Sequence, residues 1–398
     1  MGLLQKLASQ TALYGLSSVI GRLLNWGLTP LYVNYFKPGA FGVLSDLYAL
    51  SFYPQLVLTL GMETTFFRFS ENKQRENEVY ANAFYIVLLL ALCFLCIIFF
   101  LKTWIASWLG YAGHSNLILI VGGIICADII AALPLAKLRY DEKAKFFALI
   151  SFTNIGITIL LNLLFIVVLK YGLYYIFIAN LIASVVRTGL ALYDNIPSWA
   201  DVNPVTSKVM LNYGFYIMIA GLAGAVNETL DRNLLPRLWE NGTFFAGKNR
   251  TGMEMNGIYS AMYKLGMFIS LVTQAFRYAV EPYFFKSAND SEKELNFARI
   301  FHYYCTATLV MFLLISSFSH EILSFNFFGL YTGYLVPRSY WVGEPVIPLI
   351  LLANVFLGAY VNLSIWFKIT KQLRFGLWFA FWGAFITLVF NISLIPKF

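Results

Sequence analysis

The stretch "GVLSDLYAL", residues 42–50, comes back as "GIYSAMYKL" at residues 257–265. Both copies carry Gly, Ser, Tyr and Leu at the same positions, 215 residues apart. A second pair, "ITILLNLLFI" at 157–166 and "ITLVFNISLI" at 386–395, repeats at the similar distance of 229 residues. Chance likeness between apolar helices is the alternative, but the matched Gly, Ser, Tyr, Thr and Asn are not generic membrane residues. The matches therefore indicate that the second half of the chain copies the first.

Apolar segments of spanning length surround these stretches. Hydrophobic residues make up 59% of the 398 residues and charged residues 12%, whereas a soluble domain averages about 25% charged residues. Eleven segments meet or approach the ~20 residues that cross ~30 Å of hydrocarbon. They are 10–33, 41–67, 81–101, 117–136, 147–169, 173–193, 209–235, 257–281, 300–319, 345–367 and 376–395. Because lipid offers the backbone no hydrogen-bond partners, we expect an all-α, polytopic membrane protein.

The repeat also predicts how the chain divides. An offset of six spans keeps both copies in the same orientation, so an axis along the membrane normal relates them, as in transporters. We predict an N-terminal lobe of spans 1 to 6 at 1–196 and a C-terminal lobe of spans 7 to 11 at 197–398. The Pro-containing loop 194–208 reads as the linker. The second copy stops at 398, so from the symmetry of the repeat we expect it to lack a twelfth helix.

Charge distribution predicts the orientation and excludes several functions. Of the 28 Lys and Arg residues, fifteen fall on the side of the N-terminus and eight on the other side. The N-terminus is therefore expected to be cytoplasmic. The net charge of +8 reflects that face and not nucleic-acid binding, because no basic run is long enough to follow a phosphate backbone. The three histidines lack partners at catalytic spacing and the four cysteines fall in or at apolar spans, so we expect no enzyme, metal or cofactor.

Longer stretches give the chain a family resemblance. They are "GVLSDLYALSFYPQLVLTLGMETTFFRF", "LPLAKLRYDEKAKFFALISFTNIGITILLNLLFIVVLKYGL", "LDRNLL", "GIYSAMYKLGMFISLVTQAFRYAVEPYFF" and "FNISLIPKF". With these, the chain resembles the polysaccharide flippases of the multidrug, oligosaccharidyl-lipid and polysaccharide exporter superfamily. The resemblance implies two six-helix lobes around a central cavity and a monomer in the bacterial inner membrane. It also implies a lipid-linked oligosaccharide as substrate, moved between the leaflets by alternating access.

Basic residues within the spans are the first candidates for a substrate site. Each costs about 2.5 to 3.5 kcal/mol at the centre of a membrane helix, so it faces a cavity or a partner. Five are found: Arg22, Arg187, Arg232, Lys264 and Arg277. Arg187 lies near the cytoplasmic interface, where snorkelling of the side chain suffices as an explanation. The other four are predicted to bind substrate phosphate groups.

Arg22 and Arg277 each have a structural alternative. Arg22 has no acidic residue one turn away, so its guanidinium either meets a substrate phosphate bidentately or pairs with Asp46 or Asp128 on another helix. Arg277 precedes Glu281 by four residues, a spacing that allows a local ion pair.

Acidic residues within the spans are candidates for coupling to H+ or Na+. Glu228 and Arg232 stand in the favourable i, i+4 order for a helix ion pair, which leaves Asp231 over, with Asn227 one turn before it. Asp128 is alone at the middle of span 4. We predict a cation-coupling role for Glu228, Asp231, Asp128 and Asn227. The alternative, which the sequence favours for Asp231 and Arg232, is that they lock span 7 to a neighbouring helix.

Three functions follow from these features. The first is a flippase for an undecaprenyl-pyrophosphate-linked oligosaccharide in surface polysaccharide synthesis, such as an O-antigen unit of lipopolysaccharide. The second is a cation-coupled multidrug exporter or a lipid II flippase of the same superfamily, and a net negative cavity would favour the drug exporter. The third, a membrane-embedded glycosyltransferase or polymerase, is disfavoured because the longest loops have only about 25 residues. The flippase is our prediction.

Overall fold

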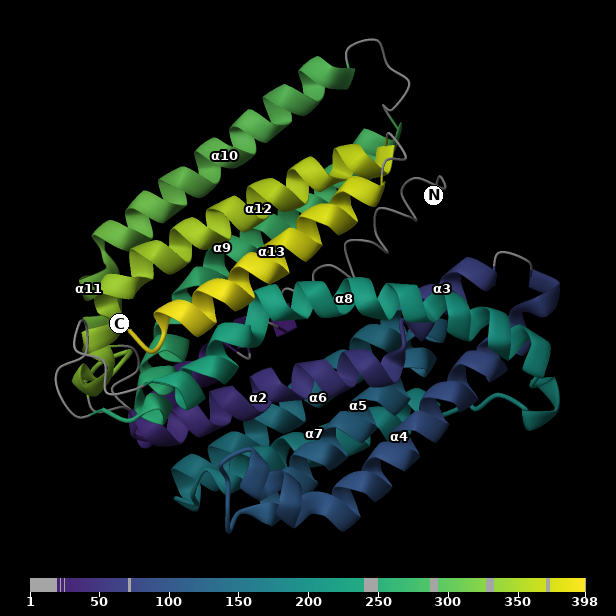
Figure 1. The fold of residues 1–398 in the computed structure, drawn as a ribbon, viewed down its shortest axis with the longest axis horizontal. Helices are drawn as coiled ribbons and strands as arrows, with labels where there is room; N and C mark the ends of the chain where they lie inside the picture. Colours follow the sequence, from purple (N-terminus) through teal and green to yellow (C-terminus); the bar gives the residue numbers. More distant parts are fainter. Residues whose placement is uncertain are drawn as a thin grey trace. The chain divides into compact units, whose positions relative to one another are not determined.

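The fold is known from a computed structural model that describes residues 20–397 apart from 22, 25, 71–72, 240–249, 287–292, 327–332 and 370–372. Every regular element of the described residues is a helix (Figure 1). Eight of the described helices are long and apolar enough to cross a membrane, and they coincide with predicted spans 2 to 7, 9 and 10. The predicted all-α, polytopic fold is confirmed.

Two compact units make up the chain. Unit 1 contains residues 1–21 and 47–229, and unit 2 contains residues 22–46 and 230–398. Two long helices, α2 (Pro38–Thr59) and α8 (Pro204–Leu238), are each divided between the units. The units therefore differ from the lobes expected from the repeat: residues 22–46 fall in unit 2, and residues 197–229 fall in unit 1. The lobe boundary near residue 196 stays a prediction.

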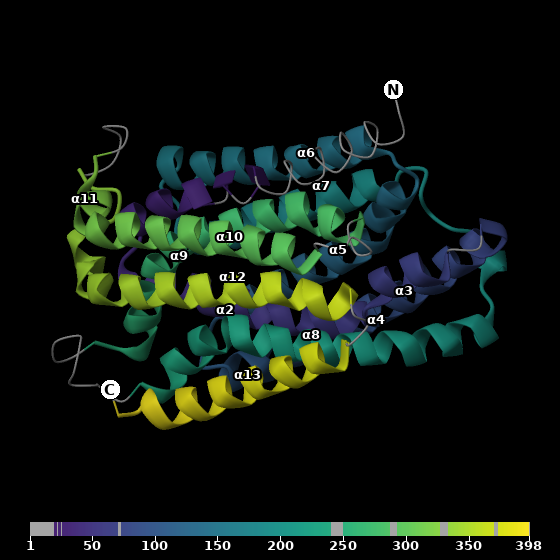
Figure 2. The ribbon, with the colours of Figure 1, turned by 90° about the horizontal axis from the view of Figure 1, so that it is seen from above.

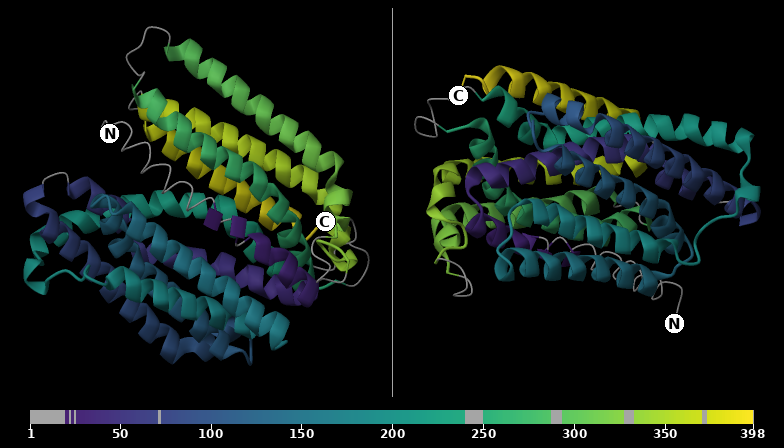
Figure 3. Two further views of the ribbon diagram at one scale, coloured as in Figure 1. Left: turned by 180° about the vertical axis from the view of Figure 1, so that it is seen from behind. Right: turned by 90° about the horizontal axis from the view of Figure 1, so that it is seen from below.

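Unit 1 is a helix bundle centred on α5. It contains α3 (Met62–Phe69), α4 (Glu76–Trp108), α5 (Ser115–Tyr140), α6 (Ala144–Asn162) with its π-helical continuation η2 (Leu163–Val168), and α7 (Tyr174–Leu192). They are among the blue and teal helices of Figure 3, where α8 is also teal. Helix α5 packs against α4 and α7, and α6 packs against α7. Two thirds (67%) of the apolar stretch of α5 is buried, against 22% for α4.

Small residues explain why α5 occupies the centre. A Cβ atom on Gly122 would lie 2.9 Å from Ile98 of α4, and one on Gly123 would lie 3.1 Å from Leu181 of α7. Lipid supplies no hydrophobic drive for helices to associate, so close packing through small residues takes its place.

The linker after α7 is docked on α4. The Tyr80 hydroxyl donates to the Asn195 carbonyl at 2.5 Å, and the Tyr85 hydroxyl donates to the Pro197 carbonyl at 2.8 Å. The Trp199 ring stands edge-on to the Tyr85 ring with centroids 4.6 Å apart. The segment that follows the predicted N-terminal lobe is therefore fixed to unit 1.

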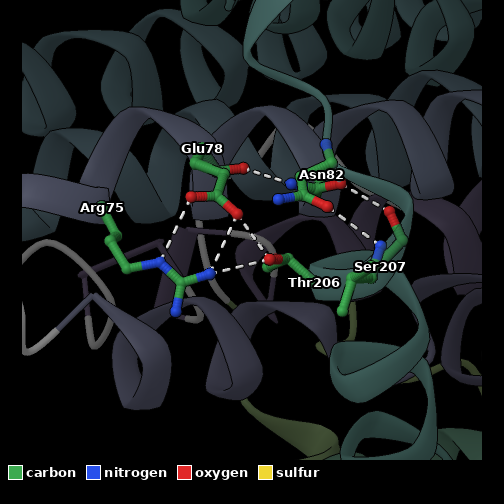
Figure 4. A network of polar contacts seen from close by, with 7 residues as sticks. Arg75, Glu78, Asn82, Thr206 and Ser207 are labelled. Atoms are coloured by element: carbon green, nitrogen blue, oxygen red, sulfur yellow. Dashed lines mark hydrogen bonds and ion pairs between the residues drawn. The ribbon is translucent and has the colours of Figure 1, made fainter.

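A polar network continues this attachment to the first turn of α8 (Figure 4). Arg75 donates to Glu78 at 3.0 Å and to the Thr206 hydroxyl at 2.8 Å. The Asn82 side chain, fully buried, accepts from the Asn203 backbone N–H at 3.1 Å and from the Ser207 hydroxyl. The Asn82 amide group thus satisfies donors at the start of α8 that have no partner within that helix.

Replacement of Asn82 by Leu is expected to destabilise unit 1. The Asn203 N–H and the Ser207 hydroxyl would lose their acceptor, at about 1–3 kcal/mol for each group left without a partner. Thermal unfolding in detergent and proteolysis within 194–203 measure the effect. Ser198→Ala is the control, because it removes one exposed bond to the Ala200 N–H and should leave both readouts unchanged. Equal stability of the Asn82→Leu variant would show that the network does not hold the linker.

Unit 2 is built around α9 (Gly252–Lys286) and α12 (Ile347–Ile369), which pack against each other. Helices α10 (Lys293–Ser317) and α13 (Leu373–Leu394) both pack on α12 (Figure 2). The short α11 (Ser319–Ser324) and η4 (Arg338–Val346) close one end.

Residues 22–46 belong to this second bundle by several contacts. The Trp26 ring packs edge-on against Phe268 of α9 with centroids 4.9 Å apart. The buried Tyr340 donates from its hydroxyl to the Phe36 carbonyl at 2.8 Å. The Asn34 amide donates to the Tyr334 carbonyl at 3.2 Å. A segment from the first half of the chain is thereby anchored among helices of the second half.

The two repeat copies meet where α2 crosses α9. A Cβ atom on Gly42 would lie 1.9 Å from the Met253 carbonyl oxygen, and one on Gly257 would lie 1.9 Å from the Pro38 carbonyl oxygen. Met253 precedes Gly257 by four residues and Pro38 precedes Gly42 by four, so the contact is reciprocal. Only glycine allows backbones this close. Reciprocal contact between matched residues is what a two-fold relation between the copies produces, and we call it the glycine crossing (Gly42, Gly257).

Candidate functional site

A fully buried carboxylate lies one turn beyond Gly42 on α2. Asp46 has 0% exposure, and its two oxygens accept from the guanidinium of Arg237 on α8 at 2.9 and 3.0 Å. The Asn233 amide also donates to it, at 2.9 Å. A buried charge is tolerated only with a partner and hydrogen bonds of this kind. We call Asp46, Asn233 and Arg237 the polar lock, since they join α2 to α8 beside the glycine crossing.

A second group of charges lies in unit 2 where α8 faces α9. The Arg232 guanidinium lies 4.7 Å from the centroid of the Tyr263 ring, a cation–π contact that orients its planar fork. Lys264 follows Tyr263 on α9 and lies close enough to Arg232 for the two charges to interact. We call Arg232 and Lys264, with Asp231, Tyr259 and Tyr263, the α8–α9 cluster.

The carboxylate of this cluster is already engaged. Asp231 accepts from the Tyr259 hydroxyl and, at 2.8 Å, from the backbone N–H of Arg232. Its side chain lies 3.8 Å from the Arg232 Nε atom. The prediction that Asp231 has no partner was wrong, because Tyr259 of the neighbouring helix α9 donates a hydrogen bond to it. The residue does connect α8 to α9, as the structural alternative held. The formal charges of the cluster sum to one positive charge.

Three further predicted site residues lie on the same two helices. Arg277 follows Lys264 by thirteen residues on the same helix, which is about 20 Å at 1.5 Å per residue. Asn227 and Glu228 are exposed in the second half of α8, and the predicted Glu228–Arg232 pair stays a prediction. Arg22 lies outside the described residues.

The ion pairs of the structure bear on the contacts predicted for three arginines. Asp46 and Asp128, the acids offered to Arg22, bind Arg237 and Arg187, and the pairing of Arg22 itself stays a prediction. The expectation that Arg187 only snorkels was wrong, because its Nη1 atom lies 3.3 Å from Asp128 Oδ1 in unit 1. The Glu281 side chain lies outside the described part of the chain, so its pairing with Arg277 stays a prediction.

The Asp128–Arg187 pair is a half-exposed site inside unit 1. The two side chains are 24% and 29% exposed and come from α5 and α7. Next to Arg187 on α7, the Thr188 hydroxyl donates to the Ala127 carbonyl at 2.7 Å and fixes the two helices. The Asn180 amide reaches the Tyr48 hydroxyl of α2 from the same helix. Asp128 is thus a partly buried carboxylate that a cationic partner holds.

The polar lock was missed at the sequence level for a clear reason. Arg237 lies at the end of an apolar segment and counted as a loop charge, and Asp46 was considered only for Arg22. An acid inside an apolar span signals that a cation lies nearby. Which cation pairs with the acid depends on which helices cross, and the sequence alone does not show how the helices cross. Among the residues that the structure describes, no three His, Cys, Asp or Glu side chains gather as metal ligands would.

Comparison with known families identifies one family for this chain. The profile of a family described as "Polysaccharide biosynthesis protein" matches residues 7–288. A search of curated proteins finds no match.

Three solved structures that share this fold are described as transporters. The multidrug transporter DinF-BH of the MATE group has a TM-score of 0.65 at 13% identity, over 99% of this chain and 94% of that one. An inward-facing multidrug resistance MATE transporter of the MOP superfamily has 0.59 at 14%, over 97% and 92%. A MOP transporter from Pyrococcus furiosus, whose binding pocket is described as of reverse polarity, has 0.55 at 14%, over 98% and 96%.

Proposed function

Because the chain belongs to the polysaccharide biosynthesis protein family, we propose that this membrane transporter flips an undecaprenyl-pyrophosphate-linked oligosaccharide for surface polysaccharide synthesis. It would do so by alternating access in the bacterial inner membrane, as a monomer with a cytoplasmic N-terminus. The membrane fold and the family support a transporter over an enzyme.

The observation that carries the proposal is the α8–α9 cluster. It presents two cations, Arg232 and Lys264, against one carboxylate that a tyrosine hydroxyl already engages. A guanidinium binds phosphate oxygens bidentately, while an ammonium acts as a mobile point charge. Placed together within the spans, they suit an anion with two phosphate groups better than a cationic drug.

The contacts of unit 2 support alternating access. The helix ends from the two halves of the chain meet there through a glycine crossing and a polar lock, neither of which is covalent. With the N-terminus in the cytoplasm, this contact lies toward the outer leaflet. In the proposed cycle, the crossing opens when the substrate is released to the outer leaflet.

A deletion strain tests this function. We expect loss of the surface polymer and accumulation of the lipid-linked oligosaccharide in the cytoplasmic leaflet, both restored by the chain expressed from a plasmid. Normal polymer without accumulation would refute the proposed substrate. Accumulation of lipid II in place of the oligosaccharide would favour the lipid II flippase.

A cation-coupled multidrug exporter is the second candidate, favoured by the MATE proteins that share the fold. The Pyrococcus transporter, described as having a pocket of reverse polarity that suggests a different function, indicates that pocket charge is a useful criterion. In this chain the α8–α9 cluster holds two cations and one carboxylate, and Glu228 stands one helical turn before Arg232. The candidate coupling residues Glu228, Asp231, Asp128 and Asn227 serve H+ or Na+ in either function.

Among the candidate coupling residues, Asp128 offers the cleanest test. We expect Asp128→Asn to make transport insensitive to collapse of the proton gradient, because an amide neither binds nor releases a proton and holds Arg187 only weakly. Substrate uptake into vesicles, with and without a protonophore, measures this. Thr188→Val is the control, since it breaks the neighbouring bond to Ala127 without a change in charge. Equal protonophore sensitivity in the Asp128→Asn variant would remove Asp128 from the coupling site.

A further inference from the structure

Buried polar atoms without partners occur in the polar lock and on the part of α9 that forms the glycine crossing. The side-chain oxygens Oδ1 of Asn233, Oδ1 of Asn256 and Oγ of Ser260 are buried and make no hydrogen bond within the described part of the chain. The three residues are 5%, 0% and 3% exposed. Native interiors contain few such atoms, and each requires an explanation.

These atoms lie on the faces that close the crossing. The Asn256 amide donates to the Gly42 carbonyl at 3.1 Å, so Asn256 faces α2. Ser260 follows it by one helical turn and is therefore on the same face. Asn233 donates to Asp46 through its amide nitrogen, and its side-chain oxygen accepts no hydrogen bond. The unpartnered oxygens thus belong to the closed contact itself.

We propose that the closed crossing is balanced between two opposed sets of groups: the Asp46–Arg237 pair holds it shut, and the unpartnered oxygens of Asn233, Asn256 and Ser260 favour its opening. On opening, the oxygens gain water as a partner, while the ion pair loses its buried geometry. The inference rests on the proposed alternating access and names the residues that set its equilibrium.

The exposure of the ion pair fits this role. Asp46 is fully buried, whereas Arg237 is 31% exposed. The arginine therefore reaches the edge of the contact, where water meets it as soon as the helices part.

The inference is tested by a cysteine pair that reports closure. A Cβ atom on Gly39 would lie 3.3 Å from the Glu254 side chain, so cysteines at these two positions are adjacent when the crossing is closed. In a background without the native cysteines, a short thiol cross-linker traps the closed form and an impermeant maleimide labels the open form. The ratio of the two products measures the equilibrium without reference to any substrate.

Ser260→Ala is expected to raise the ratio of closed to open on the order of tenfold, since it removes an oxygen that only the open form satisfies. Asp46→Asn and Arg237→Gln are expected to lower the ratio on the order of tenfold or more. Ser270→Ala is the matched control on the same helix, because its hydroxyl already donates to the Met267 carbonyl, and it should leave the ratio unchanged.

A Ser260→Ala ratio equal to or below that of the parent would overturn the inference, whatever the Asp46 variants do. Because this substitution only removes an oxygen, it keeps the test valid even where an Asp46 variant does not fold. The two proposals can fail separately. If the variants give the expected ratios but deletion of the protein leaves the surface polysaccharide intact, the inference about the crossing holds and the proposed substrate is rejected.

Discussion

Gly257→Ala is expected to abolish transport. The added Cβ atom would lie 1.9 Å from the Pro38 carbonyl oxygen and 2.9 Å from the Gly42 nitrogen, and both are backbone atoms that no side-chain rotation can move. Helices α2 and α9 would have to separate, which costs about 1–3 kcal/mol or more in a well-packed contact. The closed population would fall roughly ten- to hundred-fold, so a carrier that must close between cycles stops.

Complementation of the deletion strain measures the loss, with protein level and thermal unfolding measured in parallel. Gly224→Ala and Gly156→Ala are the matched controls, because an added Cβ atom at either helical position meets nothing within 4 Å. Alanine is favoured over glycine within helices by roughly 0.5–1 kcal/mol, so both controls are expected to be at least as stable as the parent. Full activity of Gly257→Ala would mean that the crossing is not needed for the cycle.

Removal of the two cations from the α8–α9 cluster is expected to have the second large effect. Hydrogen bonds to charged groups contribute about 1.5–3 kcal/mol each. Arg232→Met and Lys264→Met should therefore each weaken substrate binding roughly ten- to hundred-fold, and the double variant should not complement the deletion strain. Binding of the lipid-linked oligosaccharide to purified protein, followed over substrate concentration, measures the change.

Conservative variants separate charge from shape at these positions. Arg232→Lys keeps the charge and loses the planar fork, so intermediate binding is expected. Lys102→Met is the control for loss of a positive charge elsewhere, because Lys102 lies near the end of α4 against Asn116. Unchanged binding in the Arg232→Met and Lys264→Met double variant would exclude the cluster from the substrate site.

Periodicity and composition sufficed for the helices, because the bilayer permits a spanning chain few other structures. The family followed from the resemblance of longer stretches of sequence. The repeat matched Gly42 to Gly257, and the structure brings these two residues into contact. The physical reason is that matched positions of two copies lie near the axis that relates them. In contrast, the sequence did not predict which side chains pair between different helices.

Asp128 and Arg187 illustrate that limit. They lie 59 positions apart, on α5 and α7, and nothing in the local sequence of either helix points to the other. The same holds for Asp46 and Arg237, 191 positions apart. Ion pairs within one helix follow from the i, i+4 spacing, whereas pairs between helices follow from packing angles set by small residues such as Gly123.

The most direct test of the account is flipping by purified protein in liposomes. The substrate is a pyrophosphate-linked oligosaccharide lipid, compared with a lipophilic cation as a drug-like alternative. We predict that the parent chain moves the anionic lipid, that the Arg232→Met and Lys264→Met double variant does not, and that neither moves the cation. Export of the cation by the parent chain, with the anionic lipid left in its original leaflet, would contradict the account.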